Sequence, residues 1–420
     1  MRFERLADWL RWQEGLHPHT IDLGLTRIKQ VMDRLELGRP APLVISVGGT
    51  NGKGSSCVML EAILRAAGQR VGTYLSPHLL RYNERIRING VMIDDAPLCQ
   101  AFARIDAARG DISLTYFEFG TLAALLLFAE ARLDVAVLEV GLGGRLDAVN
   151  AVDADLALIT SIQMDHMEWL GSTRDEIGRE KAGIARPERP VVCADPQPPQ
   201  GFLQAVAHSR LYRSGIDYHW RQETASSWHW HDQQSEFIDL SLPTLTGSFQ
   251  LANAAAVIQS LVLLQAQGAV SITREAINEG LRRAALPGRF QRLGGPIACI
   301  LDVAHNPAAV QTLLENLARV PANIRYTVLG MLADKDVEAF AAILDAQTDY
   351  WLLGGLSGSR GLDGEPLARR LREAIPAAKI RVYPRVIDAY RQARSLALPG
   401  DRILVTGSFH TVAEVLAGQD

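Results

Sequence analysis

A glycine-rich turn at residues 49–55, GTNGKGS, carries a lysine and a hydroxyl group directly after the apolar run PLVISVG. The common nucleotide-binding loop is written G-x-x-x-x-G-K-[ST]. Here Val47 stands where the first glycine belongs, and Gly54 stands where the pattern has a hydroxyl. The physical parts remain, because glycines let successive N–H groups point at an anion and Lys53 can reach its outer oxygens. The turn is either a phosphate cradle or a strand-to-helix turn with a solvated lysine.

The residues on either side of the turn favour phosphate binding. The preceding run has the composition of a buried strand, and SSCVMLEAILRAAG, which opens at Ser55, has the spacing of a helix. The positive end of that helix dipole would face the same anion. Since a strand before and a helix after are the context that a phosphate loop requires, we expect phosphate binding by Gly52, Lys53, Gly54 and Ser55.

Further polar residues follow the predicted strands. Glu139 ends LDVAVLEV, and a carboxylate there can hold magnesium on nucleotide phosphates, or it is a solvated acid at the end of a strand. His166 in SIQMDHMEWLG follows DLALITSI and can ligate a metal or act as a general base, although a lone histidine is more often structural. Lys181 in GREKAGIARP lies on a short predicted helix, and pattern alone indicates a surface lysine.

Ser76 ends another predicted strand in LSPHLLRYNERIR, where Pro77 forces the chain out of the sheet. His78, Arg81 and Arg85 follow it. These side chains either receive an anionic substrate or form an ordinary polar loop, and the sequence favours neither.

In the C-terminal part, Asp302 and His305 lie in DVAHNP at the end of a predicted strand, and Arg289 lies in a Pro/Gly-rich stretch. We expect them to face the same crevice as the phosphate turn if two domains close on each other. In WHWH, His229 and His231 would share one face of a strand, a spacing that permits metal capture. Without another Cys or His cluster nearby, an exposed hairpin face is the favoured interpretation.

The bulk composition bounds the class of protein. The 420 residues are 48% hydrophobic and 21% charged, and 43 basic against 47 acidic side chains give a net charge of −4. This balance argues against nucleic acid or an anionic membrane as the main partner. The four cysteines form no C-x-x-C pair, which is typical of reduced core thiols and makes a zinc site unexpected. The longest apolar run, residues 122–129, is far shorter than the roughly 20 residues of a membrane helix, so we expect a cytoplasmic protein without a signal peptide.

Alternating strand-like and helical segments predict an α/β protein with a mostly parallel sheet. The Pro/Gly-rich stretch LPGRFQRLGGP suggests a linker. We expect a P-loop domain at 1–288, a linker at 289–296, and a smaller Rossmann-like domain of about five strands at 297–420. Residues 210–248, rich in Trp, His, Ser and Gln, are expected to form a peripheral antiparallel excursion.

Together these segments resemble one family. GTNGKGS, SPHLLRYNERI, LTYFEFGT, LEVGLGGRLDAVN, MDHMEWLG, REKAGI, LPGRFQ and DVAHNP resemble the folate branch of the Mur ligase superfamily, the bifunctional dihydrofolate synthases/folylpolyglutamate synthases. The resemblance runs from TIDLGLTRI near residue 20 to TGSFHTVAEV near 406. It implies a central-domain-like P-loop fold and a magnesium- and ATP-dependent ligase that phosphorylates a carboxylate and joins it to the amine of L-glutamate. The glycine between lysine and hydroxyl in the turn also matches the folate branch.

The resemblance assigns roles to matching positions. ATP phosphates would lie on residues 52–55, and ATP would also contact Asn253, Arg289 and Asp302. Two magnesium sites would use Ser55, Ser76, Glu139, His166 and Lys181. Family members carry the matching lysine as a carbamate, which would make Lys181 an anionic ligand. The catalytic residues would be Lys53, His166 and Lys181, and glutamate would lie near His305 and Ser408.

The same resemblance implies a pterin pocket and two activities. Matching positions for 7,8-dihydropteroate are Asp22, Thr115, Tyr116, Phe117, Leu146, Asp147 and Ala148. The second activity would add glutamates to reduced folates. Separately from the resemblance, no segment such as a heptad zipper demands a partner chain, so we expect a monomer. A monofunctional folylpolyglutamate synthase, another Mur-type ligase such as a peptidoglycan precursor ligase, and a non-enzymatic P-loop regulator remain alternatives. A GTPase-like switch would need an N-K-x-D segment, which the chain lacks.

Overall fold

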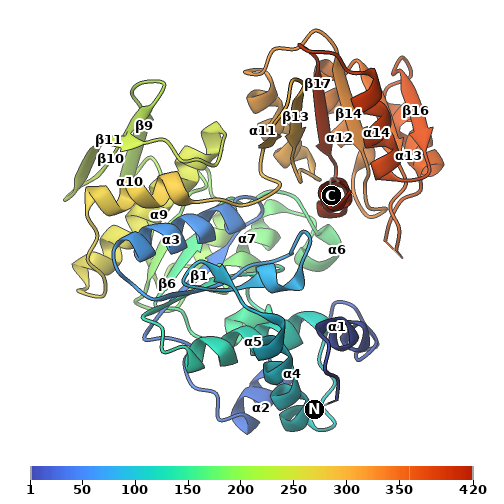
Figure 1. Cartoon of the computed structure of the whole chain (residues 1–420). Coiled ribbons are helices and arrows are strands. Elements are labelled where there is room, and N and C mark those ends of the chain that lie inside the picture. Colours follow the sequence, from blue (N-terminus) through green and yellow to red (C-terminus); the bar gives the residue numbers. More distant parts are fainter. Residues whose placement is uncertain (1, 359, 419–420) are drawn as a thin grey trace. The chain divides into compact units, whose positions relative to one another are not determined.

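The computed structural model of the chain describes residues 2–358 and 360–418 (Figure 1). The chain forms two compact units. The first comprises Met1–His78, Tyr82–Thr244 and Gln250–Ala285, and the second comprises Leu79–Arg81, Leu245–Phe249 and Leu286–Asp420.

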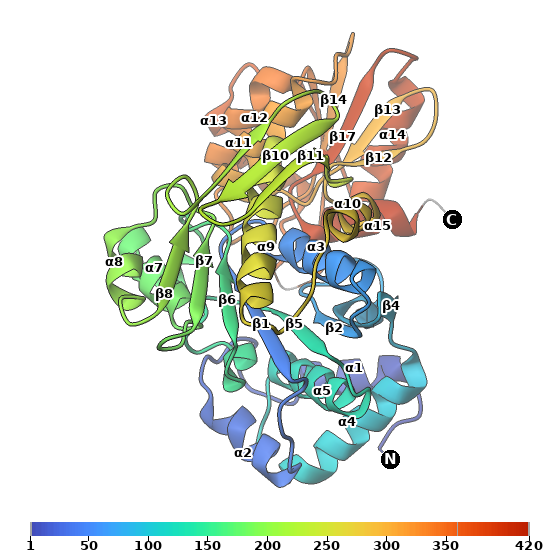
Figure 2. The same cartoon turned by 90° about the vertical axis from the view of Figure 1, so that its left-hand side faces the viewer.

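The first unit is built on an eight-stranded sheet in the order β4-β3-β2-β5-β1-β6-β7-β8. From β2 to β8 neighbouring strands are parallel, whereas β3 and β4 add an antiparallel edge. Figure 2 shows β8, β7, β6, β1, β5 and β2 side by side. The strands are β1 (Leu43–Gly48), β2 (Val71–Tyr74), β3 (Ile86–Ile88), β4 (Val91–Met92), β5 (Val135–Glu139), β6 (Leu156–Ile159), β7 (Pro190–Cys193) and β8 (Arg210–Arg213).

Helices cover both faces of this sheet (Figures 1 and 2). Those of this part of the chain are α1 (Leu6–Glu14), α2 (Thr26–Arg34), α3 (Lys53–Ala66), α4 (Asp95–Arg109), α5 (Tyr116–Glu130), α6 (Met167–Leu170), α7 (Arg174–Ala182), α8 (Gln200–Ala205), α9 (Ser248–Ala266) and α10 (Arg274–Arg283), with 3-10 turns η1 (Tyr82–Arg85) and η2 (Ala148–Ala151). Aromatic and aliphatic residues of α1, α4 and α5 pack with the sheet into one core that includes Trp9, Phe102, Phe119 and Phe128. This core fixes the strands whose ends carry the polar side chains.

The connection from β1 to α3 lies where the strand order reverses. β1 is central and pairs with β5 on one side and β6 on the other, which is the point of an open α/β sheet where ligands bind. Helix α3 begins at Lys53, two residues earlier than the sequence predicted, because the amide of Ser56 already donates to Gly52 O at 2.9 Å. Lys53 and Gly54 therefore belong to the first helical turn.

The Trp/His-rich segment differs in part from expectation. β8 joins the main sheet as a parallel edge strand, so the antiparallel excursion is limited to β9 (Tyr218–Gln222), β10 (Ser227–Asp232) and β11 (Glu236–Ser241). The expected exposed hairpin face is wrong for β10, because Trp228 and Trp230 are fully buried and His229 is only 7% exposed. Within the described residues, no group of three His, Cys, Asp or Glu side chains is placed to hold a metal ion.

Helix α9 is the longest apolar helix of the chain. Its window Phe249–Ala266 has the length and hydropathy of a membrane-spanning helix, but 72% of that window is buried inside the structure. The same length and composition occur in a helix at the centre of a protein core, so this test does not by itself indicate a membrane span.

The second unit contains a six-stranded sheet in the order β12-β13-β17-β14-β15-β16. The strands are β12 (Gln291–Leu293), β13 (Ala298–Leu301), β14 (Arg325–Leu329), β15 (Tyr350–Gly354), β16 (Ile380–Tyr383) and β17 (Arg402–Thr406). The helices are α11 (Pro307–Leu317), α12 (Val337–Leu344), α13 (Gly364–Ala374), α14 (Val386–Leu396) and α15 (Phe409–Ala417), with the 3-10 turn η3 (Asp345–Gln347). Two separate apolar clusters on the sheet include Phe340 and Trp351 in one and Tyr390 and Val412 in the other.

This sheet corrects two expectations. The predicted linker 289–296 is not a free connection, because it contains β12, which pairs antiparallel with β13. The second unit consequently begins at Leu286, inside the first domain that the sequence predicted. With β12 added to the five parallel strands, the sheet has six strands rather than about five.

Candidate active site

The glycine-rich turn has a backbone that only glycine adopts easily. Gly49 and Gly52 have φ of 140° and 95°, in the range that L side chains rarely occupy. A Cβ on Gly49 would lie 1.9 Å from Thr160 Oγ1, and one on Gly52 would lie 2.8 Å from the Asn253 amide oxygen. The shape of the turn therefore depends on its glycine torsions and on close packing against Thr160 and Asn253. The turn ends at the first residues of α3, where a helix has free backbone N–H groups.

Two lysine amines meet at one carbonyl in this turn. Lys53 Nζ donates to Gly49 O at 3.1 Å and to Thr50 O at 3.1 Å. Lys181 Nζ donates to Gly49 O at 3.0 Å from α7, across 132 residues of sequence. Lys181 is thus not the surface lysine that pattern alone indicated, since it is 3% exposed.

The environment of Lys181 favours the neutral amine. Burial and, to a smaller extent, the Lys53 ammonium lower the pKa of Lys181 to about 7, while Asp165 acts in the opposite direction. The helix that holds it is fixed at its start by a capping box between Thr173 and Glu176. A neutral buried amine is the form that can react with an electrophile such as carbon dioxide.

A polar chain links Ser55 to α9. Gln250 Nε2 donates to Ser55 Oγ at 3.1 Å, and Asn253 Nδ2 donates to Gln250 Oε1 at 3.2 Å. All three side chains are at least 93% buried. Sequence reasoning missed Gln250. The only signal in the sequence was that Gln250 and Asn253 lie three residues apart on a mostly apolar helix, α9.

Ser76 and Glu139 are joined at the ends of β2 and β5. The backbone N–H of Ser76 donates to Glu139 Oε2 at 2.8 Å, and Glu139 is 3% exposed. The carboxylate therefore lies against the neighbouring strand end, as the alternation of parallel strands predicted. This contact rules out the alternative of a solvated acid.

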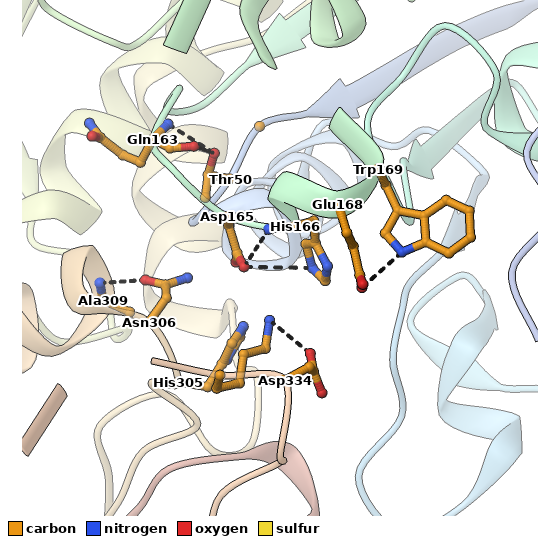
Figure 3. A network of polar contacts seen from close by, with 12 residues as sticks. Thr50, Gln163, Asp165, His166, Glu168, Trp169, His305, Asn306, Ala309 and Asp334 are labelled. Atoms are coloured by element: carbon orange, nitrogen blue, oxygen red, sulfur yellow. Dashed lines mark hydrogen bonds and ion pairs between the residues drawn. The ribbon is translucent and has the colours of Figure 1, made fainter. Parts of the chain in front are cut away.

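His166 follows β6 in an unusual backbone conformation. Its φ is 50°, and it precedes the single helical turn α6. Figure 3 shows Asp165 turned toward it: Asp165 Oδ1 accepts from His166 N at 2.9 Å and lies 4.0 Å from Nε2. Thr50 and Gln163 form two hydrogen bonds nearby. The backbone N–H of Gln163 donates to Thr50 Oγ1 at 3.0 Å, and Thr50 Oγ1 donates to the backbone carbonyl of Gln163 at 3.2 Å.

These donors fit a magnesium ion only when other oxygens join them. Magnesium prefers oxygen ligands and usually shares them with phosphates and water. Ser55, Ser76 and Glu139 offer hydroxyl and carboxylate oxygens, and no three His, Cys, Asp or Glu side chains in the described residues form a metal group alone. The protonated amine of Lys181 has no lone pair and cannot ligate a cation, whereas a carbamate on the same nitrogen would offer anionic oxygens.

The three segments expected to hold the pterin are tied together. Arg27 Nη1 donates to Asp22 Oδ2 at 2.6 Å and Arg27 Nε donates to Glu118 Oε1 at 3.2 Å. Glu118 in turn accepts from the N–H of Thr115 at 2.8 Å, completing the capping box of α5. The Gly24 amide donates to Leu146 O at 3.1 Å. Sequence reasoning missed Arg27 and Glu118, because their contact spans 91 residues and no local spacing reveals it.

The remaining residues of this group are mostly buried. Asp147 is 2% exposed and accepts from the amides of Leu142 and Val149 at 2.8 and 3.0 Å. Burial raises the pKa of Asp147 to about 7, while those N–H groups act in the opposite direction. Burial likewise raises the pKa of Tyr116 to about 12. Phe117 packs 6.0 Å from the Tyr74 ring centroid, and Ala148 is 5% exposed.

The second unit carries its own cluster at the carboxyl ends of β13 and β17. Asp302 accepts from the amides of Phe290 and Ala304 at 2.8 and 2.9 Å, and burial raises its pKa although Arg289 opposes the shift. Both Arg289 and His305 contact the Phe409 ring, at 5.1 and 6.2 Å from its centroid.

Two helix starts belong to the same cluster. Ser408 caps α15 by accepting from Thr411 N at 3.0 Å. Asn306 caps α11 by accepting from Ala309 N at 2.8 Å (Figure 3). The structure thus brings together Arg289, Asp302, His305 and Ser408 within this unit.

Family models match both parts of the chain. Residues 47–261 match the Mur ligase middle domain, and residues 288–409 match the Mur ligase glutamate ligase domain. The predicted fold class, a P-loop domain like the Mur ligase central domain followed by a smaller Rossmann-like domain, is confirmed by these matches and by the sheets described above.

Curated relatives and solved structures cover nearly the whole chain. The dihydrofolate synthase/folylpolyglutamate synthase of Escherichia coli (strain K12) is 44% identical over 414 residues, spanning 98% of this chain and 94% of the relative. The protein of the same name from Haemophilus influenzae is 42% identical, spanning 98% of this chain and 97% of the relative.

The structure of E. coli FolC in complex with DHPP and ADP has a TM-score of 0.93 at 44% identity, covering 99% of this chain and 98% of that one. A bifunctional folylpolyglutamate synthase/dihydrofolate synthase with Mn, AMPPNP and L-glutamate bound has a TM-score of 0.91 at 47% identity, covering 99% and 98%. The resemblance inferred from the sequence is confirmed, and the chain belongs to the dihydrofolate synthase/folylpolyglutamate synthase family of Mur ligases.

Proposed function

We propose that this chain is an ATP-dependent carboxylate–amine ligase that joins L-glutamate to 7,8-dihydropteroate and adds further glutamates to reduced folates. The observation that carries the proposal is the convergence of Lys53 and Lys181 on Gly49 O, in a turn that leads from the central strand into α3. The matched relatives carry these two activities in their names. Structures of relatives in complex with ADP, or with Mn, AMPPNP and L-glutamate, support ATP and a divalent metal as the cofactors.

The reaction solves the poor reactivity of a carboxylate. One carboxylate oxygen of the acceptor attacks the γ-phosphorus of ATP, and ADP leaves with the electrons of the broken P–O bond. The glutamate amine then attacks the acyl carbon, loses a proton, and expels phosphate that keeps the acceptor's original oxygen. Charge builds on the transferring phosphoryl group, so fixed cations and N–H donors lower the barrier.

The residues divide this work. Backbone N–H groups of residues 52–55 and the Lys53 amine would hold the phosphates. Magnesium, held by Ser55, Ser76, Glu139, His166 and Lys181, would neutralise phosphate charge when bound. We propose that Asn253, Arg289 and Asp302 contact ATP, and that His305 and Ser408 lie near the incoming glutamate.

We further propose that Lys181 carries a carbamate and that two magnesium sites result. The neutral amine attacks carbon dioxide, forms the N–C bond and gives up a proton, so a buried cation becomes an anion beside Lys53. The pKa of about 7 supports this step. Incubation with ¹³C-bicarbonate should give a carbamate resonance in the wild type that is absent from Lys181→Arg. A wild type without the resonance under carbonate-replete conditions would contradict the proposal.

The pterin residues favour two activities over one. Asp22, Thr115 and Leu146 belong to segments that Arg27, Glu118 and Gly24 tie together. The decisive assay compares dihydropteroate and tetrahydrofolate as acceptors with ATP and glutamate, following ADP release and product length. Both acceptors should be used. Activity with tetrahydrofolate alone would indicate a monofunctional folylpolyglutamate synthase, and activity with neither would favour another Mur-type ligase or a nucleotide-binding regulator.

Small molecules are the proposed partners, without nucleic acid or membrane. The near balance of charge supports the absence of a nucleic-acid partner, and the four free, buried cysteines support a reducing compartment, the cytoplasm. We also propose that the enzyme is a monomer. Sedimentation equilibrium should give the monomer mass, and a dimer mass would contradict this part of the proposal.

A further inference from the structure

Arg85 is a buried cation that has no acidic partner among the residues that the structure describes. It ends η1 and is 8% exposed. Its Nε donates to Nδ1 of the His78 ring at 2.9 Å. Within residues 2–358 and 360–418, no ion pair joins Arg85 to a carboxylate. A charge that far from water is costly unless an opposite charge meets it.

Two other arginines of the chain, Arg402 and the partly buried Arg87, have oxygen partners. Arg402, 1% exposed, donates to the carbonyls of Leu317, Val320 and Gln347. Arg87, two residues after Arg85, lies 3.2 Å from the buried carboxylate of Glu61. Arg85 differs from both, because its side chain donates to a ring nitrogen of His78 and hydrogen-bonds with the hydroxyl of Tyr74 rather than with a carboxylate or carbonyl oxygen.

The groups around Arg85 do not supply the missing negative charge. Its guanidinium lies over the rings of Tyr82 and Tyr116, 5.3 and 5.7 Å from their centroids. Burial raises the pKa of Tyr82, of Tyr116 and of the neighbouring Tyr74, so all three phenols stay neutral. Cation–π contacts and a hydrogen bond with the Tyr74 hydroxyl offset part of the cost of burying the charge, and none of these groups is an anion.

The position of Arg85 in the fold indicates which anion its guanidinium would bind. Its carbonyl accepts from the N–H of Leu75 at 2.8 Å, and the next residue, Ser76, is bound to Glu139 at the proposed metal residues. On its other side the guanidinium contacts Tyr116, one of the proposed pterin residues. The acceptor's carboxylate must lie between its pterin end and the phosphate, and Arg85 contacts residues next to both of the proposed sites.

We propose that Arg85 binds the carboxylate of the acceptor substrate and so selects acids and holds the reacting oxygen. The guanidinium fork matches a carboxylate with two parallel hydrogen bonds. This inference rests on the proposed ligase function and adds to it a residue that neither the phosphate turn nor the pterin segments contain.

The test uses the whole enzyme and two ligands that differ only in charge: pteroic acid and its carboxamide. Calorimetry should show the wild type binding the acid at least tenfold tighter than the amide, since hydrogen bonds to a charged group have about this effect. In R85M the ratio should fall toward one, and KM for dihydropteroate should rise about tenfold or more, while KM for ATP stays within about twofold.

R87M is the matched control, because it removes a nearby, partly buried arginine whose counterion, Glu61, lies within the chain. It should unfold at a lower temperature, since the buried carboxylate of Glu61 loses its ion-pair partner, yet keep the preference for the acid. R85M should keep or raise the unfolding temperature. If R85M does not fold, R85Q replaces it, since the amide can still donate to His78 but carries no charge.

Three results would overturn the inference. They are an unchanged acid-to-amide ratio in R85M or R85Q, a lowered unfolding temperature with unchanged acceptor KM, and a rise in KM confined to glutamate. If the wild type releases no ADP with dihydropteroate and glutamate, the proposed function itself fails, and the acid-to-amide binding ratio still tests Arg85 independently.

Discussion

The amines of Lys53 and Lys181 donate to a single oxygen atom, the carbonyl of Gly49, at 3.1 and 3.0 Å. Burial, together with repulsion from the Lys53 ammonium, lowers the pKa of Lys181 to about 7. We expect the negative oxygens of a triphosphate bound in this turn to replace the carbonyl as the common partner of the two amines.

Lys53→Ala should remove ligation while leaving the fold intact. Loss of the amine removes charge stabilisation of the transferring phosphoryl group, so ADP release should fall about 100- to 1,000-fold. Steady-state kinetics and circular dichroism test this together. Lys379→Ala, which removes an exposed lysine of the second unit, is the control and should turn over normally. Near-normal turnover in Lys53→Ala would refute the role of the turn.

Gly52→Ala should weaken nucleotide binding, because the added Cβ both strains the backbone and collides with a neighbouring side chain. An alanine at φ 95° costs about 1–2 kcal/mol, and its Cβ would also meet the Asn253 amide at 2.8 Å. Gly68→Ala is matched, because φ is 83° and no atom lies within 4 Å of the added Cβ. Calorimetric titration with AMPPNP should show a loss of affinity in Gly52→Ala only, and equal affinities would contradict the packing argument.

Stability of the nucleotide-free, carbonate-free enzyme should rise with pH above neutrality. The folded pKa of Lys181, about 7, lies below its ordinary value of 10.5. Between these values the unfolded chain holds a proton that the folded chain has released, so raising the pH favours the folded state. Below pH 7 both states are protonated and this dependence ends. Urea unfolding from pH 7 to 10 should show the rise, and Lys181→Met should flatten it; an identical slope would contradict a buried amine.

Arg27→Met should impair dihydropteroate use more than folate extension. The change leaves the 3% exposed carboxylate of Glu118 without its cation, a loss of about 2–4 kcal/mol given that the arginine itself is partly exposed. Asp22 would also lose its anchor, so KM for dihydropteroate should rise. Arg5→Met, which breaks the exposed pair with Asp8, should change neither quantity. If Arg27→Met has wild-type stability and a wild-type KM for dihydropteroate, Arg27 does not hold Asp22 and Glu118 in place as proposed.

Much of the fold could be predicted because its signals are local. The buried strand before Lys53, the alternation of strands and helices, and the positions of Ser76, Glu139 and His166 at strand ends all follow from short segments. The role of β12 could not be predicted, since Pro and Gly made residues 289–296 resemble a free linker although Gln291–Leu293 pair with the next strand.

The site was predictable only where the residues themselves have reactive chemistry. The burial of Lys181 depends on Gly49, 132 positions away, and the bond from Arg27 to Glu118 spans 91. Such contacts are set by tertiary packing, so pattern alone indicated a surface lysine and gave Arg27 no role. From the sequence, Arg85 belongs equally well to an anion-binding site or to an ordinary polar loop. Its burial and its neutral neighbours, which favour the anion-binding site, are visible only in the structure.

Transfer of oxygen tests the central claim most directly. Dihydropteroate labelled with ¹⁸O in its carboxylate is incubated with ATP, glutamate and the enzyme, and the phosphate produced is analysed by mass spectrometry. If the acceptor's oxygen attacks the γ-phosphorus, each inorganic phosphate carries one ¹⁸O. Phosphate without ¹⁸O, formed together with dihydrofolate, would contradict phosphorylation of the acceptor and the account built on this turn.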